Sequence, residues 1–179
     1  MGKSSNTQKL NIVGVDQMKP PELWSLYSSV VRRLKEIGQI RSNNITGERG
    51  EQLAISYYNS TVGLPKLQAA PKGTQNVDAI SKRGDRYTIK TIMIPHKTTG
   101  VFYGMGTPDN PLNDKKFEYL VIVLINEYYE LDKIIELIWE DLLTYKKWHS
   151  RMNAFNINLT KELLSKAKII YYKDGVKIV

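Results

Sequence analysis

The chain has no cysteine among its 179 residues, which excludes disulfides, thiolate zinc sites and cysteine nucleophiles. It has only two histidines, His96 and His149, and these lie too far apart in the sequence to indicate a local metal pair. The longest apolar run, residues 119–125, is too short to cross a bilayer, and no early stretch has the pattern of a secretory signal. We therefore expect a cytoplasmic protein that has no membrane segment.

Acidic residues are fewer than basic ones, 18 against 26, which gives a formal charge of +8 and a pI near 9.5. A basic surface attracts polyanions such as nucleic acid or an acidic membrane. Charge alone does not identify the partner, because many lysine-rich proteins bind neither. The length and the 41% of hydrophobic residues are those of a single globular domain, residues 1–179, with a substantial core.

Two amphipathic patterns predict helices in the first third of the chain. Residues 1–19 are rich in Ser, Asn, Gln and Lys, which indicates a loose N-terminal arm. Apolar residues then recur at intervals of three and four over 22–37, and Gly38 ends the pattern. A second helix is predicted over 46–58 with Thr46 as its N-cap.

The remaining segments predict an α/β fold, a mixed central β-sheet flanked by α-helices. Residues 118–125 have the continuous apolar composition of a buried central strand. Residues 95–114 predict a long loop, and loops of that length are usually functional or mobile. We expect a core over residues 20–126 and a C-terminal elaboration over 127–179. Within the latter the patterns predict a strand over 128–138, for which a helix stays open, helices over 139–148 and 160–168, and a closing hairpin of 169–172 with 176–179.

A predicted hairpin over residues 76–91 carries the chemically distinctive side chains. Successive residues of a strand point to opposite faces, so the two faces differ in character if the connection near Gly84 keeps the register. The apolar face would carry Val77, Ala79, Tyr87 and Ile89, and the other face Asp78, Thr88 and Lys90.

A carboxylate and an amine on one surface of a sheet are what a metal-dependent phosphodiesterase needs. Asp78 could bind the metal ion, while Lys90 could hold or activate the attacking water. The alternative is an exposed cross-strand ion pair of the two side chains, which would contribute only about 0 to 1 kcal/mol.

Glu51 is a third candidate for this site. Steps of three and four residues from Glu51 reach Ala54, Ile55 and Tyr58, so its carboxylate shares the face of the helix that is predicted to be buried. Burial of a carboxylate without a partner is costly, which favours a functional role. For Glu48, stabilisation of the first helical turn by the helix dipole is sufficient explanation.

This order of parts resembles the PD-(D/E)xK nuclease superfamily, the restriction-endonuclease-like proteins that include junction resolvases and Mrr-like endonucleases. In that superfamily a helix glutamate, often after a Gly-rich lead such as residues 47–51, precedes a strand that bears an aspartate. A strand that bears acid-x-Lys or Gln-x-Lys follows. The resemblance covers about residues 22–126 and rests on Glu51, Asp78 and Lys90.

The resemblance implies a magnesium-dependent endonuclease that hydrolyses phosphodiester bonds in DNA. Asp78 would be the central ligand of Mg²⁺, Glu51 would complete the metal site, and the backbone carbonyl of Ile89 would add a ligand. Lys90 would orient the water and stabilise developing negative charge. A restriction or defence enzyme of this kind would act on double-stranded DNA as a homodimer.

Thr88 departs from the superfamily pattern, which usually has Glu, Asp or Gln at that position. A hydroxyl is a poorer magnesium ligand than a carboxylate, so a nuclease-derived DNA-binding protein with a decayed catalytic site is the second interpretation. A basic protein-interaction domain is the third. Weaker candidates for contacts with nucleic acid, each of which could equally belong to a solvated surface, are Lys82, Arg83, Tyr103, Lys115 and Lys116.

Overall fold

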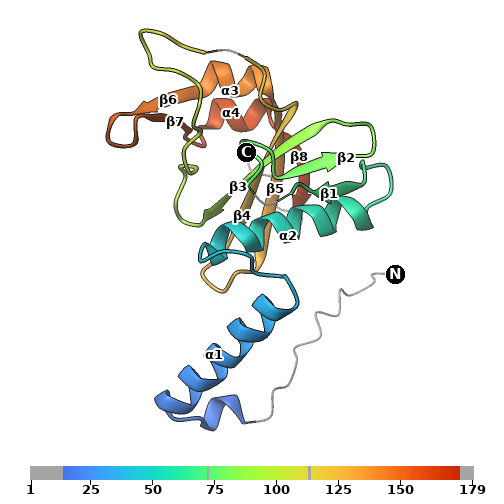
Figure 1. Cartoon of the computed structure of the whole chain (residues 1–179), viewed down its shortest axis with the longest axis vertical. Helices are drawn as coiled ribbons and strands as arrows, with labels where there is room; N and C mark the ends of the chain where they lie inside the picture. The colour runs from blue at the N-terminus through green and yellow to red at the C-terminus, as the bar shows by residue number, and fades with distance from the viewer. Residues whose placement is uncertain (1–13, 72, 113, 174–179) are drawn as a thin grey trace. The chain divides into compact units, whose positions relative to one another are not determined.

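The computed structural model describes residues 14–71, 73–112 and 114–173, and residue contacts divide the chain into two compact units, Met1–Arg41 and Ser42–Val179. In the first unit a short 3₁₀ helix, η1 (Val15–Gln17), precedes α1 (Pro20–Glu36) (Figure 1). The backbone N–H of Lys19 donates to Glu22 Oε2 at 2.6 Å, which caps the start of α1. The helix predicted over 22–37 is confirmed.

The second unit is built on a mixed six-stranded sheet in the order β1-β2-β3-β4-β5-β8. β3 and β4 run parallel, and all other neighbours in the sheet run antiparallel. The predicted α/β class with a mixed central sheet is confirmed. The strands are β1 (Leu67–Ala69), β2 (Ala79–Ser81), β3 (Arg86–Met93), β4 (Tyr119–Ile125), β5 (Leu131–Ile138) and β8 (Lys168–Tyr172).

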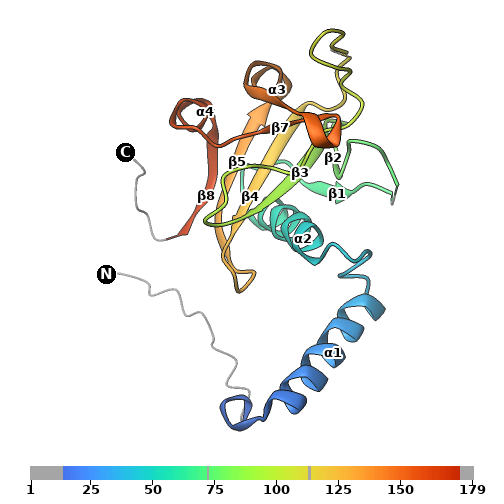
Figure 2. The ribbon, with the colours of Figure 1, turned by 90° about the vertical axis from the view of Figure 1, so that its left-hand side faces the viewer.

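Helices cover both faces of this sheet (Figure 2). On one face α2 (Ile45–Ser60) packs Ala54 and Tyr58 against Val121 and Val123 of β4. On the other face α3 (Trp139–Tyr145) and α4 (Lys161–Lys166) pack against alternate residues of β4 and β5. A small antiparallel hairpin of β6 (Lys146–His149) and β7 (Ala154–Ile157), joined by the 3₁₀ helix η2 (Ser150–Met152), extends this second layer.

β4 occupies the buried centre that its composition predicts. Leu120, Val121, Ile122 and Val123 have no measurable solvent exposure, because α2 covers the odd-numbered positions and the second layer covers the even-numbered ones. The C-terminal segment beyond residue 126 contributes β5 and β8 to the same sheet.

Two local predictions are wrong, and a third is not tested. The N-cap of α2 is Asn44 rather than Thr46, and the Asn44 side chain accepts a hydrogen bond from the backbone N–H of Gly47 at 3.1 Å. The helix predicted over 139–148 ends at Tyr145, because residues 146–149 pair with β7 as a strand. β8 pairs with β5, and the strand predicted to form a hairpin with it, 176–179, lies outside the described residues, so that hairpin stays a prediction.

Residues 95–112 and 114, the described part of the predicted loop, are irregular, as predicted, but the segment is attached to the second layer. Thr98 and Phe102 form isolated bridges to Asn158 and Phe155. Of the predicted N-terminal arm, residues 1–13 lie outside the described residues. In the described parts of the chain, no helix is long and apolar enough to cross a membrane.

Candidate functional site

The hairpin of β2 and β3 keeps the register that the sequence argument requires. Ala79 pairs with Tyr87 and Ile80 with Arg86, while Gly84 allows the turn because it adopts a φ of 90°. The Ser81 hydroxyl donates to Asp85 Oδ2 at 2.8 Å and accepts from the Asp85 backbone N–H at 3.1 Å. Asp78 and Thr88 are therefore opposite each other, as predicted.

Asp78 lies just before β2 and is held through both its backbone and its carboxylate. Its N–H donates to the Tyr87 carbonyl at 2.8 Å, and its own carbonyl accepts from the Ala70 N–H at 2.9 Å. Carboxylate oxygen Oδ2 accepts from the Thr88 hydroxyl at 3.1 Å and from the Ile89 N–H at 2.7 Å. Both hydrogen bonds within the described residues go to Oδ2, so Oδ1 is the oxygen that can take a further ligand.

Thr88 orients the Asp78 carboxylate instead of serving as a second metal ligand next to it. The residue is 2% exposed, and its hydroxyl donates to the Asp78 carboxylate. A buried hydroxyl committed in this way fixes the orientation of its acceptor. Thr88 is thus a positioning residue for Asp78. The superfamily pattern, which has Glu, Asp or Gln at this position, did not suggest this role.

Ile89 places its backbone at the point where β2 and β3 separate. The pairing of the two strands ends at Ala79 and Tyr87, and the Ile89 N–H is turned towards Asp78. In an extended strand the N–H and C=O of one residue point to the same side. The Ile89 carbonyl therefore faces the same edge as the Asp78 carboxylate, as a carbonyl ligand would have to.

Lys90 lies on the face of the sheet opposite α2, with its Nζ 5.0 Å from the centroid of the Phe102 ring. Burial lowers the pKa of the Lys90 amine, and the negative charges of Asp78 and then Glu51 oppose that shift. The negative charges of Asp78 and Glu51 thus both act on the Lys90 amine. Phe102 was not predicted, because it lies in the long irregular segment.

The position of Glu51 depends on a close contact between α2 and β3. Gly50 packs directly against the Thr91 side chain, and a Cβ atom at residue 50 would overlap the Thr91 hydroxyl. This contact holds the first turns of α2 against β3, one residue from Lys90. Glu51 itself is half-buried, whereas Glu48 is buried. An interaction with the helix dipole alone therefore does not fully account for Glu48.

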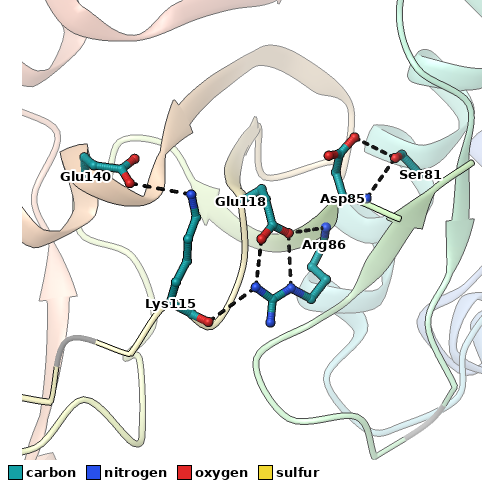
Figure 3. A network of polar contacts seen from close by, with 6 residues as sticks. All are labelled: Ser81, Asp85, Arg86, Lys115, Glu118 and Glu140. Carbon is teal, nitrogen blue, oxygen red and sulfur yellow. Dashed lines mark hydrogen bonds and ion pairs between the residues drawn. The ribbon is translucent and has the colours of Figure 1, made fainter. Parts of the chain in front are cut away.

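An ion pair that sequence reasoning missed joins the starts of the parallel strands β3 and β4 (Figure 3). Arg86 Nη2 donates to Glu118 Oε1 at 2.7 Å and Nε to Oε2 at 3.1 Å, and the Arg86 backbone N–H donates to Oε2 at 2.7 Å. These hydrogen bonds hold the pKa of Glu118 at about 2. The pair fixes the two strands at the end where β3 leaves the hairpin.

The weaker candidates for phosphate contacts differ in their surroundings. Lys82, Arg83 and Tyr103 are exposed. Lys115 pairs with Glu140 at 3.5 Å (Figure 3), and Lys116 pairs with Asp114 at 3.8 Å. Acidic neighbours thus compensate the charges of the last two lysines, which makes Lys82 and Arg83 the better candidates.

The donor atoms at the site suit magnesium, which prefers hard oxygen ligands and retains several waters. Asp78 and Glu51 carry carboxylates whose charges act on Lys90, and the Ile89 carbonyl faces the edge at which the Asp78 carboxylate lies. In the described residues no group of three or more His, Cys, Asp or Glu side chains is placed to hold a metal ion. The candidate set has only two such side chains, Asp78 and Glu51, because Thr88 stands where the superfamily pattern has Glu, Asp or Gln.

Comparison with known proteins adds no further constraint on the site. No protein-family model matches the chain, and no curated protein matches it in sequence.

Proposed function

We propose that this protein is a magnesium-dependent endonuclease that hydrolyses phosphodiester bonds in double-stranded DNA, of the restriction or defence type, and that it acts as a homodimer. The observation that carries the proposal is that the Asp78 carboxylate is held by Thr88 and Ile89 where β2 and β3 separate, one residue before Lys90, and that its negative charge acts on the Lys90 amine. A solvent-exposed ion pair would not need a buried hydroxyl and a backbone N–H on the carboxylate.

The order of elements supports the proposal. Helix α2 with Glu51 precedes β2, and the Asp78 that begins this hairpin precedes Lys90 on β3. The buried strand β4 follows and runs parallel to β3. This is the order of elements on which the resemblance to PD-(D/E)xK nucleases rests.

Each residue of the site has a separate task in this reaction. Asp78, Glu51 and the Ile89 carbonyl would hold Mg²⁺, which when bound polarises the phosphate and lowers the pKa of a water. The Lys90 amine, beside the Phe102 ring, donates hydrogen bonds to the attacking water or to a phosphate oxygen and stabilises its negative charge. Thr88 keeps the Asp78 carboxylate in one orientation.

A second candidate function is DNA binding without cleavage, by a protein whose nuclease site has decayed. It is favoured by Thr88, because the hydroxyl donates to Asp78 instead of adding a ligand. A Glu or Asp at position 88 would provide one more carboxylate. Without it, the site would bind Mg²⁺ less tightly.

Cleavage of a supercoiled plasmid separates the two functions. We expect the wild-type protein to cut the plasmid with Mg²⁺ and not with EDTA, and Lys90→Ala to remove cutting while DNA binding is retained. Lys166→Ala is the matched control, since it removes an exposed lysine from α4, outside the proposed site. Binding by the wild-type protein without cutting in Mg²⁺ or Mn²⁺ would establish the second function instead.

A further inference from the structure

The hairpin β6–β7 lies in the longest stretch of the C-terminal third that contains no acidic residue. Between Asp141 and Glu162 the chain has four basic residues and no Asp or Glu. Three of the four, Lys146, Lys147 and Arg151, belong to the hairpin and its turn. Because no acidic residue in this run compensates the positive charge, the run attracts polyanions.

The two faces of the hairpin differ sharply. Trp148 pairs with Phe155 and Lys146 with Ile157 on the face that packs into the core, where Phe155 and Ile157 are buried. The opposite face pairs Lys147 with Asn156. On this opposite face Lys147 is exposed and Asn156 half-buried, while the next pair, His149 with Ala154, turns its alanine into the core.

The turn of the hairpin presents Arg151. The turn is formed by Ser150–Met152, and Asn153 closes it with a φ of 45°. The backbone N–H of Met152 donates to His149 Nδ1 at 3.3 Å, which stabilises the turn. Arg151 is exposed, and within the described parts of the chain neither it nor Lys147 makes a hydrogen bond or ion pair.

The hairpin is joined to the proposed catalytic site through Phe102, which bonds to the hairpin by its backbone and contacts Lys90 by its ring. The Phe102 N–H donates to the Phe155 carbonyl at 2.6 Å, and the Phe155 N–H donates to the Phe102 carbonyl at 3.4 Å. The same Phe102 places its ring beside Lys90. The hairpin thus lies on the Lys90 side of the sheet, and Figure 1 shows it reaching away from the sheet with its turn at the far end.

We infer that the β6–β7 hairpin is the DNA-reading element of this protein, which places Arg151 in the major groove and Lys147 against the phosphate backbone. A two-stranded antiparallel ribbon fits the major groove, and arginine reads guanine there through two hydrogen bonds. Asn156, on the outward face beside Lys147, is the second side chain that can contact base edges. The inference rests on the proposed function for its substrate, duplex DNA.

Binding to a short labelled duplex in EDTA tests the inference independently of cleavage. We expect the double variant Lys147→Ala/Arg151→Ala to weaken DNA binding at least tenfold. The slope of the logarithm of the binding constant against the logarithm of the salt concentration should fall by roughly two, one for each lost phosphate or groove contact. The control Lys161→Ala/Lys166→Ala removes the same charge from exposed positions of α4 and should change binding less than about threefold. Thermal melting verifies that all variants are folded.

Selection from a pool of randomised duplexes tests base reading. The wild-type protein should enrich a motif that contains guanine, and Arg151→Lys, which keeps the charge, should lose the preference at one position. Equal binding by the hairpin and control variants, or an unchanged motif in Arg151→Lys, would overturn the inference. Equally strong binding to poly-glutamate would overturn it in favour of an acidic protein partner.

The proposed function and this inference can fail separately. Hairpin-dependent binding without any cleavage would overturn only the nuclease proposal. Cleavage with binding that is indifferent to the hairpin would overturn only the reading role.

Discussion

Thr88 is the residue at which this site differs most from what its sequence pattern suggests. The pattern places Asp78, Thr88 and Lys90 on one face, and the register of β2 and β3 confirms that Asp78 and Thr88 are opposite each other. Period-two alternation does not say which groups bond to each other. The hydrogen bond from Thr88 to Asp78 depends on a side-chain orientation that packing decides.

We predict that Thr88→Val lowers the cleavage rate by about tenfold to a hundredfold, because a hydrogen bond to a charged acceptor contributes about 1.5–3 kcal/mol. The variant should also need more Mg²⁺ for half-maximal cleavage, since Asp78 would sample other orientations. Thr88→Ser, which keeps the hydroxyl, should restore both values. The measurement is a Mg²⁺ titration of cleavage, and an unchanged Mg²⁺ requirement in Thr88→Val would contradict the positioning role.

Glu118 provides the pH-dependent contribution to stability. Its pKa is about 2 in the folded protein, against 4.5 for the ordinary side chain, because of the hydrogen bonds from Arg86. A carboxylate with a lowered pKa stabilises the fold above pH 4.5, and this contribution is lost as the pH falls from 4.5 towards 2.

We therefore predict that Glu118→Gln lowers the free energy of unfolding by about 1–2 kcal/mol at neutral pH. The difference from the wild-type protein should shrink between pH 4.5 and about 2. Urea unfolding as a function of pH measures it. A difference that stays constant over that range would mean that the ion pair with Arg86 does not hold the glutamate ionised.

At the scale of elements, the crossing of α2 over β3 determines where Glu51 lies. Gly50 is the residue in contact with Thr91, and the Thr91 hydroxyl is buried without a hydrogen-bond partner in the described residues. In an exposed helix Gly→Ala would be stabilising by about 1 kcal/mol. Because a Cβ atom at residue 50 would overlap the Thr91 side chain, we expect Gly50→Ala to be destabilising instead.

We predict that Gly50→Ala destabilises the protein by about 1–3 kcal/mol, because α2 must move away from β3. Thr91→Ala removes the clashing hydroxyl and methyl groups, so the double variant should recover part of that loss. Cleavage should fall with Gly50→Ala as Glu51 shifts away from Lys90. A stabilised Gly50→Ala protein would show that the helix does not approach the strand this closely.

The elements themselves were predictable where their hydrophobic pattern is local. α1, α2 and β4 follow from periodicity and composition, although the cap of α2 was misplaced by two residues. β6 was not predictable, because its strand conformation depends on pairing with β7 and on the packing of Trp148 against Phe155. Periodicity also could not rank Glu48 against Glu51, since residues three apart share one side of a helix.

For the whole molecule, the symmetry of the substrate leads to a prediction about assembly. A duplex has two strands related by a two-fold axis, and a two-fold dimer presents one site to each of them. We predict that the wild-type protein is dimeric on DNA by sedimentation. It should convert supercoiled plasmid to the linear form with little nicked intermediate. Accumulation of nicked circles by a monomer would contradict the dimer.

The central claim is that Asp78 belongs to a metal-dependent site that cuts DNA, and the rate of a single turnover tests it most directly. End-labelled duplex saturated with protein is mixed with Mg²⁺, and the wild-type protein is compared with Asp78→Asn. Asp109→Asn, which alters an exposed acid in the long loop, is the control. We expect cleavage by Asp78→Asn to fall at least a thousandfold, which corresponds to about 4 kcal/mol. DNA binding by Asp78→Asn and cleavage by Asp109→Asn should both equal those of the wild-type protein. Cleavage by Asp78→Asn at the wild-type rate would contradict the central claim.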